Sequence, residues 1–412
     1  MSSSIERLPV EVFDIIADDL DLPALQNLRL SSRQLHLLTF STFAKRHFSE
    51  LTTTLGSASL DRLIHVANHR HLCHAVRVLD IRLLNHRDYK TLNTISRVAI
   101  FPPPKRFPKV SGVREEHITD EAITFDYVMK SKYPRRIYNQ LVLALRRFCD
   151  LKVVRFRAKH AEPFGWRATV MPEGDCVFRS KCFQAVTDAL LVSEVALEDF
   201  SMAKGMRTTS MSKGVNLPYS ILQLSLPSLQ ALPHGFSSLR SLTLSIVVDD
   251  GNPRSPGWED VLGHLIITAP RLKSLALSLD RGTNASRFSA AIIRSLSLSC
   301  RLQDLEVLRL LNCSLHEDHL AAFVSAHATS LRQVVFSDIR LVTGTWSSIW
   351  STLKESSELE CLRLASLEGT NNPVVFRKRG KEHPKIILDV EKDERTMSEM
   401  IDDLIAACDL WT

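Results

Sequence analysis

The sequence predicts an α/β protein in which three short N-terminal helices precede an irregular array of repeated strand–helix units. In the first 38 residues, apolar side chains recur at helical spacing. Further along, an L-x-x-L-x-L pattern returns several times, with helical periodicity between its copies. A strand followed by a returning helix, repeated in sequence, makes neighbouring strands parallel. We therefore expect parallel strands on one face and helices on the other.

The first helix is predicted from Val12, Ile15, Ile16 and Leu20, which recur at i, i+3, i+4 and i+8. That spacing places them on one apolar face of a helix. Pro9 suits the first helical position because its missing N–H costs nothing there.

Two more short helices are expected before residue 39. The break at 21–23 separates the first helix from a second one, which Leu25 and Leu28 mark. Ser31 and Gln34 have the S-x-x-Q spacing of a capping box, which predicts the start of a third helix. Three helices this short bury too little to be stable alone, so they need a partner or the rest of the chain.

This N-terminal stretch resembles an F-box. The opening Leu8-Pro9-x-Glu11, the apolar positions Ile16, Leu20 and Leu25, and the basic position Arg33 match the motif, while Leu35 stands where the family often has Trp. The resemblance implies that residues 1–50 dock on the Skp-type adaptor of a cullin-based ubiquitin ligase. The adaptor-binding residues that it implies are Leu8, Pro9, Glu11, Ile16, Leu20, Leu25, Leu28, Arg33 and Leu35. The alternative is an ordinary helical cap, because short motifs match by chance.

The repeat pattern is clearest at Leu305–Leu315, which fits the leucine-rich repeat L-x-x-L-x-L-x-x-N/C-x-L at every defined position. Other copies of its core begin at residues 151, 192, 239, 272, 331 and 359. Because no such unit is stable alone, the copies are expected to stack into a solenoid over residues 51–412. An earlier helix over 60–69 and a strand over 74–81 resemble the segment that follows the F-box in many fungal F-box proteins.

Helices are expected within 134–149 and over 258–269, 287–298, 317–328 and 345–355. Long insertions are expected at about 86–133 and 200–216, with loops at 101–108, 162–176 and 249–256. A strand over 386–390 and a helix from about Thr396 to Leu410 are predicted to cap the last repeat.

Composition points to a reducing compartment. The net charge of +6 is mild and does not by itself indicate nucleic-acid binding. Eight cysteines without a C-x-x-C pair do not suggest a disulfide framework. Five of them are expected to be buried thiols: Cys73, Cys149, Cys300, Cys313 and Cys361. With no apolar signal core and no long apolar run, we expect a cytoplasmic or nuclear protein without a membrane partner.

Candidate chemistry is weak. His65, His69, His71 and His74 surround Cys73 and could hold zinc, although a turn of exposed histidines explains them more simply. His316 and His319 have i, i+3 spacing where a zinc protease needs i, i+4. Basic clusters at 130–157 and 377–381 could bind an acidic partner or remain solvated.

The resemblance implies a non-catalytic substrate receptor of an SCF-type ubiquitin ligase, with no cofactor and no metal, whose solenoid holds a target protein. The alternative is a leucine-rich-repeat scaffold or inhibitor with no ligase role. A hydrolase built on a histidine cluster has no motif behind it. An exposed apolar face across Leu8–Leu38 would favour the receptor, and a face buried against Leu60–Ile81 would favour the cap.

Overall fold

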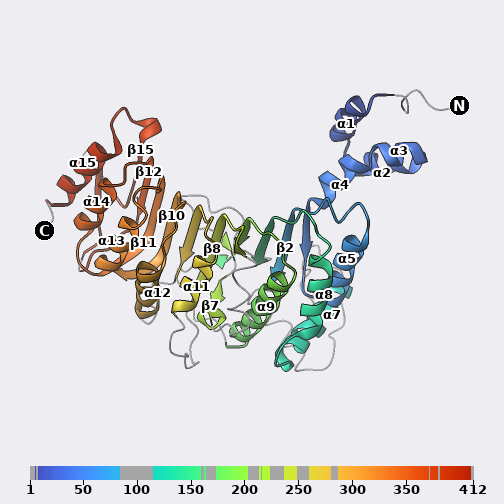
Figure 1. Cartoon of the computed structure of the whole chain (residues 1–412), viewed down its shortest axis with the longest axis horizontal. Coiled ribbons are helices and arrows are strands. Elements are labelled where there is room, and N and C mark those ends of the chain that lie inside the picture. The colour runs from blue at the N-terminus through green and yellow to red at the C-terminus, as the bar shows by residue number, and fades with distance from the viewer. Residues whose placement is uncertain are drawn as a thin grey trace.

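The chain folds into a mixed α/β structure with a large, mostly parallel sheet and a group of helices at its N-terminal end (Figure 1). The computed structural model describes residues 5, 8–83, 115–158, 162–163, 173–202, 213–214, 216–222, 236–247, 259–279, 286–370, 372–378 and 381–409. The helices α1 (Val10–Asp19), α2 (Leu22–Ser31), α3 (Arg33–Leu38) and α4 (Phe40–Phe48) come first. The sheet begins at Glu50, next to the predicted boundary between the two parts.

The main sheet is open and curved, with helices along one of its faces (Figure 1). Its successive strands are β1 (Glu50–Thr53), β2 (Val78–Leu83), β3 (Val153–Ala158), β5 (Asp199–Ser201), β8 (Ser241–Val247), β9 (Ser274–Ser278), β10 (Val307–His316), β11 (Gln333–Thr343), β12 (Cys361–Ala365) and β15 (Lys385–Asp389). All neighbours in this order are parallel except β12 and β15. The short β7 (Leu217–Pro218) also pairs with β8.

The apolar positions of the repeats form one continuous row across the sheet. Strand register aligns Leu79, Val154, Phe200, Leu242, Leu275, Leu308, Val334 and Leu362. Each of these side chains is 0% exposed. Because side chains alternate between the two faces of a strand, these aligned residues all point from the same face of the sheet into one core.

The helices between the strands cover that core. They are α5 (Ser57–Asn68), α7 (Glu115–Lys130), α8 (Arg135–Leu145), α9 (Glu173–Val192), α11 (Asp260–Ile267), α12 (Ser286–Ser299), α13 (Glu317–Ser325) and α14 (Trp346–Lys354). Buried residues from these helices join the strand residues in one hydrophobic cluster. The helices predicted within 134–149 and after residue 257 are present, with ends that differ by a few residues.

One predicted repeat copy was out of place. The copy expected to begin at residue 192 lies at the end of α9 and in the turn after it, and the strand β5 follows at Asp199. Leu197, Phe200 and Met202 supply the buried positions instead. The spacing of Val192, Val195 and Leu197 matched the pattern because the apolar end of α9 is followed closely by Val195 and Leu197, of which Leu197 also begins the true copy.

The predicted insertions and loops contain some regular structure that was not predicted from the sequence. The predicted 86–133 insertion contains the helix α7, while 84–114 lies outside the described residues. The loops predicted at 101–108 and 249–256 also lie outside them, and 162–176 includes β4 (Glu162–Pro163) and the start of α9. The region 200–216 contains the end of β5 and β6 (Lys213–Gly214). The strand predicted over 74–81 begins later, at Val78, because residues 69–75 form a turn.

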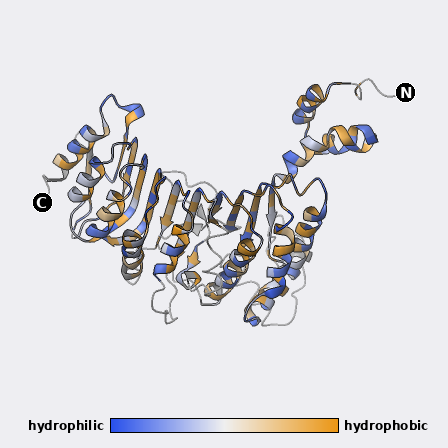
Figure 2. Ribbon diagram, in the orientation of Figure 1, coloured by the Kyte–Doolittle hydropathy of each residue, from blue (hydrophilic) through white to orange (hydrophobic). Residues whose placement is uncertain are grey.

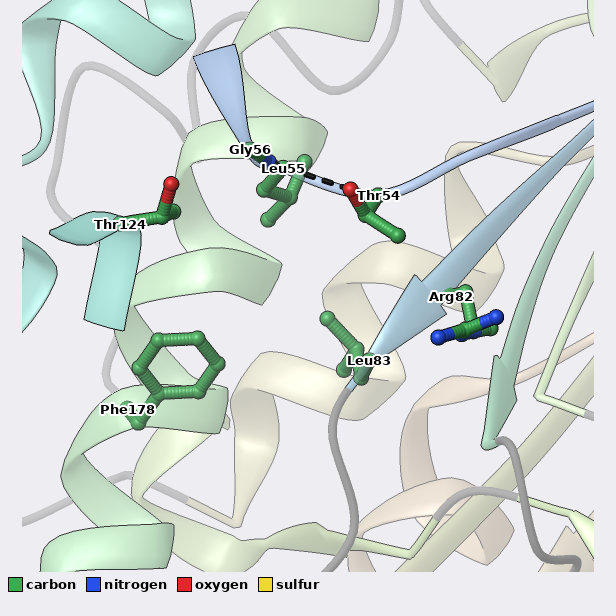
Figure 3. A pocket seen from close by; sticks show the side chains of 7 residues that line it. All are labelled: Thr54, Leu55, Gly56, Arg82, Leu83, Thr124 and Phe178. Atoms are coloured by element: carbon green, nitrogen blue, oxygen red, sulfur yellow. Dashed lines mark hydrogen bonds between the residues drawn. The ribbon is translucent and has the colours of Figure 1, made fainter. Parts of the chain in front are cut away.

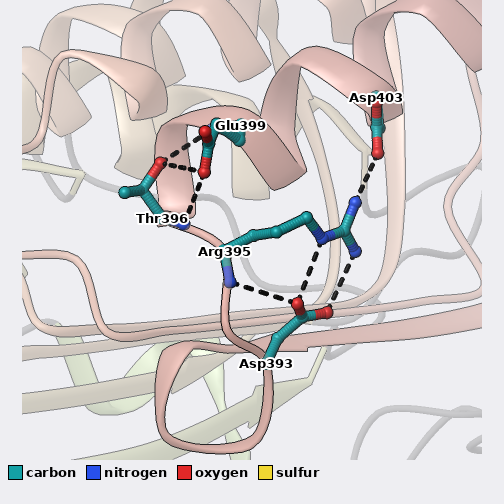
Figure 4. A network of polar contacts seen from close by, with 5 residues as sticks. All are labelled: Asp393, Arg395, Thr396, Glu399 and Asp403. Carbon is teal, nitrogen blue, oxygen red and sulfur yellow. Dashed lines mark hydrogen bonds and ion pairs between the residues drawn. The ribbon is translucent and has the colours of Figure 1, made fainter.

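The C-terminal cap is present as expected. β15 covers β12 in antiparallel pairing, and the helix α15 (Met397–Asp409) buries Met400, Ile401 and Leu404. Thr396 and Glu399 form a reciprocal capping box, in which the Thr396 N–H donates to Glu399 Oε2 over 2.8 Å (Figure 4). Arg395 joins Asp393 to Asp403 beside it, so the helix start is fixed by several polar contacts (Figure 4).

Of the basic run predicted at 377–381, Arg377 and Lys378 lie in β13 (Phe376–Lys378) and Lys381 in β14 (Lys381–His383), two antiparallel strands, while 379–380 lie outside the described residues. Two cysteines differ from expectation: Cys149 is exposed and Cys361 is half-buried, whereas Cys73, Cys300 and Cys313 are buried. Cys149 lies in the turn after α8, outside the packed face of the sheet. None of the described helices combines the length and apolarity that a bilayer crossing requires.

Candidate functional site

The four N-terminal helices have a hydrophobic core of their own. Phe13, Ala17, Leu25 and Leu35 are buried together, separately from the cluster beneath the sheet. Ile5, Leu20, Leu28, Leu38 and Phe43 pack around them. The core of the unit α1–α4, which we call the helical unit, is therefore separate from the core that includes Leu60, Leu79 and Ile81. In Figure 1 the helical unit projects from the end of the sheet next to β1.

Polar contacts attach α1 to α4. Thr42 Oγ1 donates to Asp14 Oδ1 over 2.6 Å. The Arg46 guanidinium donates to the carbonyl oxygens of Asp18 and Leu20, at 2.9 and 2.6 Å. These carbonyls end a helix and lack partners within it, so the arginine satisfies them and also brings positive charge to the negative end of the helix dipole.

Side-chain caps set the starts of α2 and α3. Asp21 accepts a 2.8 Å hydrogen bond from the Ala24 N–H. Ser32, not the predicted Ser31, caps α3, with Leu35 N–H donating to its Oγ over 3.2 Å. Ser31 is the last residue of α2, so the predicted cap was one residue too early, and Leu35 at N3 cannot complete a capping box. Both caps follow the usual preference for short polar side chains at helix starts.

An arginine lies against the aromatic side of α4. The Arg29 guanidinium carbon is 3.7 Å from the centre of the Phe43 ring, a cation–π contact. Burial lowers the pKa of Arg29. Burial also lowers the pKa of His47, and the positive charges of Arg46 and Arg29 lower it further. The lowered pKa favours the neutral form of His47 beside two arginines.

The predicted histidine cluster contributes to the joint between the helical unit and the sheet. Phe40, at the start of α4, stacks on His69 with ring centres 5.9 Å apart and meets His71 edge-on at 5.6 Å. Within the described residues, no group of three or more His, Cys, Asp or Glu side chains is placed to hold a metal ion. Of the predicted cluster, His69 and His71 thus pack against an aromatic ring, while His74 Nδ1 lies 4.0 Å from Asp150 Oδ2.

The helical unit leaves large apolar side chains in solvent. Ile15 is 67% exposed, Leu30 85% and Leu37 67%. Val10, Val12 and Leu22 are exposed as well, and Figure 2 shows hydrophobic residues over α1–α3. Six exposed apolar residues in about thirty are far more than isolated surface leucines would give, and such groups mark interaction sites.

The predicted adaptor-binding residues fall into three sets by exposure. Pro9, Glu11 and Arg33 are exposed, and Leu8, Ile16, Leu20 and Leu28 are half-buried. Leu25 is 0% and Leu35 5% exposed, so these two residues cannot contact a partner directly. They can only hold the surface residues in place by packing in the core beneath them.

The apolar face predicted for α1 lies mainly on the outer side of the helix, away from the core of the helical unit. Phe13 and Ala17 point inward, while Val12 and Ile15 are in solvent. The inward side is the one that meets α4 through Asp14 and Thr42.

Sequence reasoning missed Leu30 and Leu37 as surface residues. A usable signal existed, because both fall outside the spacing that joins Leu25 with Leu28 and Leu35 with Leu38. An apolar residue where the helical period predicts a polar one suggests a surface that another molecule covers.

A shallow hollow lies apart from the helical unit. It is lined by Thr54, Leu55, Gly56, Arg82, Leu83, Thr124 and Phe178 (Figure 3). The apolar side chains that line it belong to Leu55, Leu83 and Phe178, and the polar ones belong to Thr54, Thr124 and Arg82. No pair of groups suited to acid–base catalysis converges there.

Comparison with protein-family models and with curated protein sequences finds no match.

Proposed function

We propose that this chain is a non-catalytic substrate receptor of an SCF-type ubiquitin ligase, acting in the cytoplasm or nucleus. In this proposal the helical unit docks on a Skp-type adaptor, which links it to a cullin scaffold, and the sheet domain holds a target protein. The observation that carries the proposal is an independent helical unit with its own core and exposed apolar side chains. A simple cap would bury those side chains against the first repeat.

The sheet domain supports the same proposal. Its motif residues align in one buried row, as stacked leucine-rich repeats require. The opposite face of the strands leaves polar side chains such as Arg309, Gln333 and Arg363 partly accessible. A long curved face of this kind suits the binding of another protein.

The mechanism is proximity. Holding a target near a ubiquitin-charged conjugating enzyme raises the effective concentration of the target's lysines at the reacting thioester. Only binding surfaces are then needed from this chain, and no side chain has to touch the transferred ubiquitin.

The test is binding to a purified Skp-type adaptor. Ile15→Asp with Leu30→Asp places charges at two exposed positions, which spares the core around Phe13 and Leu25. Leu8 and Leu20, the choice from sequence alone, are half-buried and are poorer sites for charge. We expect the full chain to capture the adaptor and the double variant to lose it. A matched control is Ile123→Asp with Leu298→Asp, two exposed apolar positions outside the helical unit.

Equal adaptor binding by wild type and the Ile15/Leu30 variant would refute the proposed docking surface. If the wild-type chain does not bind the adaptor, the alternative of a leucine-rich-repeat scaffold without a ligase role would be favoured. The helical unit would then dock on another protein. The unfolding temperature of each variant shows whether its sheet core is intact.

A further inference from the structure

The edge of the sheet where the strands begin carries a continuous backbone ladder. Arg77 N–H donates to the Ser49 carbonyl over 2.9 Å, and Lys152 N–H donates to the Arg77 carbonyl over the same distance. The same step then repeats from strand to strand. Successive donors are Glu198, Arg240, Lys273, Glu306, Arg332 and Glu360, each at 2.8 or 2.9 Å from the carbonyl before it. The side chains of these residues are therefore neighbours along one line.

The charges along this line follow a pattern. From Arg77 to Glu360 the signs run plus, plus, minus, plus, plus, minus, plus, minus. Lys152 pairs with Glu198 at 3.0 Å, Lys273 with Glu306 at 2.5 Å, and Arg332 with Glu360 at 3.3 Å. Every acidic residue of the line thus forms an ion pair with one cation of the line.

Two cations are left over. Arg77 and Arg240 are exposed, and neither side chain has an ion pair or hydrogen bond with the residues that the structure describes. Each stands directly beside another cation, Lys152 or Lys273, whose acid partner lies on the far side. Arg240 also neighbours Glu198, but Glu198 pairs with Lys152. Like charges on facing positions of neighbouring strands are unfavourable, so local packing does not account for these arginines.

The turns that lead into the strands extend the positive charge. Residues 69–77, 146–152, 193–198, 236–240 and 268–273 hold eight Lys or Arg and only three Asp or Glu. The later turns, 300–306, 326–332 and 355–360, hold two and five. Arg146 and Arg147 follow the C-terminal end of α8, where positive charge interacts favourably with the helix dipole. This explains their presence in part. We call the eight cations the basic edge: Arg70, Arg77, Arg146, Arg147, Lys152, Arg240, Arg271 and Lys273.

We propose that the basic edge binds an acidic, extended segment of a partner protein. Arg77 and Arg240 lie on strands three steps apart, which is about 14 Å at roughly 4.8 Å per strand. In an extended peptide, residues i and i+4 point to the same side and are also about 14 Å apart. Carboxylates at that spacing can meet both arginines. The site shares no residue with the apolar surface of α1–α3, so it does not depend on the proposed function.

A protein segment fits this edge better than a nucleic acid. Single-stranded nucleic acids use exposed aromatic rings on which bases stack. The phenylalanines of these turns, Phe148 and Phe236, are 3% and 0% exposed. Glu198 also interrupts the line of cations between Lys152 and Arg240, and it would repel a continuous run of phosphates.

The experiment measures binding of a short fluorescent peptide of alternating Asp and Ser to the full chain. Arg77→Glu with Arg240→Glu should weaken binding by about tenfold, as expected for two exposed ion pairs, and salt should weaken the wild-type complex. A peptide of alternating Asn and Ser should not bind. The matched control, Arg136→Glu with Arg294→Glu, changes the same charge on exposed helix positions of α8 and α12 and should bind like wild type.

Stability gives an independent readout. Arg77→Glu places a carboxylate beside Lys152, whereas Arg240→Glu places one between Lys273 and Glu198, so attraction and repulsion offset each other and the variant should unfold at about the wild-type temperature. A variant that unfolds earlier and binds the peptide unchanged would assign the arginines a structural role instead. Failure of the wild type to bind the Asp peptide, or tighter binding of an oligouridine, would overturn the proposal.

Discussion

Asn312 in β10 and Asp338 in β11 occupy equivalent positions on adjacent strands, and both have left-handed backbones, with φ of 50° and 56°. The residues on either side of them pair directly, Leu311 with Ser337 and Cys313 with Ile339. Ser366, which follows β12, has a φ of 50° as well. The same local turn of the chain therefore recurs in consecutive repeats. Asn and Asp adopt this conformation more easily than most residues.

Asn312→Gly and Asn312→Ala separate the backbone from the side chain at this turn. Both lose the amide that donates to Ser278 Oγ over 3.2 Å, but only alanine keeps a Cβ at positive φ. We expect the alanine variant to be less stable than the glycine variant by about 1 kcal/mol. Denaturant unfolding of the two proteins measures the difference. Equal stabilities would show that the left-handed backbone carries no strain.

The sequence predicts the later repeats well because burial imposes their period. Leu275, Leu308 and Leu362 lie where the motif places them, since a strand position facing the core tolerates only apolar residues. The copy at residue 192 failed because Leu197 belongs to two overlapping patterns. The helical periodicity of α9 continues to Val192, and only the strand pairing of Phe200 with Val154 and Leu242 resolves the choice.

The candidate site was harder to predict for a related reason. Periodicity locates an amphipathic helix, but it does not show which apolar side the protein itself covers. Phe13 is buried inside the helical unit and Ile15 is exposed, because the side of α1 that faces inward also forms the Asp14–Thr42 hydrogen bond. Such contacts between residues 28 positions apart have no signature in the local pattern.

Arg46→Met should loosen α1 without affecting the sheet. The change removes the donors that reach the Asp18 and Leu20 carbonyls but keeps an apolar stem of similar length. Hydrogen exchange should show faster exchange of the α1 amides, because a helix held by fewer contacts opens more often. Amides of β8 to β12 should exchange as in wild type, since the two hydrophobic cores are separate. Lys45→Met, at an exposed neighbouring position, is the control.

Asp199 should make stability depend on pH. Burial raises the pKa of Asp199 to about 6, although the nearby Arg155 charge and a Ser201 hydrogen bond act in the opposite direction. The folded state then binds a proton more tightly than the unfolded state, whose carboxyl has the ordinary value of 3.8. The contribution of Asp199 to the free energy of unfolding is therefore largest below about pH 4 and is lost as pH rises through about 6.

Asp199→Asn removes this titration. Relative to wild type, the variant should gain stability as pH rises from about 4 to about 7, by on the order of 2–3 kcal/mol. Denaturant unfolding at several pH values gives the difference curve. A flat difference across that range would mean that the Asp199 carboxyl keeps its ordinary pKa.

The C-terminal cap should be stabilised by the apolar side of α15 far more than by its ion pairs. Ile401 is 0% exposed in the cluster that includes Trp350 and Leu353 of α14, so Ile401→Ala should cost about 2–5 kcal/mol through lost burial and a cavity. Asp402, on the next position, pairs with Lys354 at 2.6 Å but is exposed, so Asp402→Ala should cost under about 1 kcal/mol. Denaturant unfolding of both variants tests the contrast. Similar losses for the two changes would mean that α15 is attached mainly through charge, and that the last repeat does not need an apolar cover.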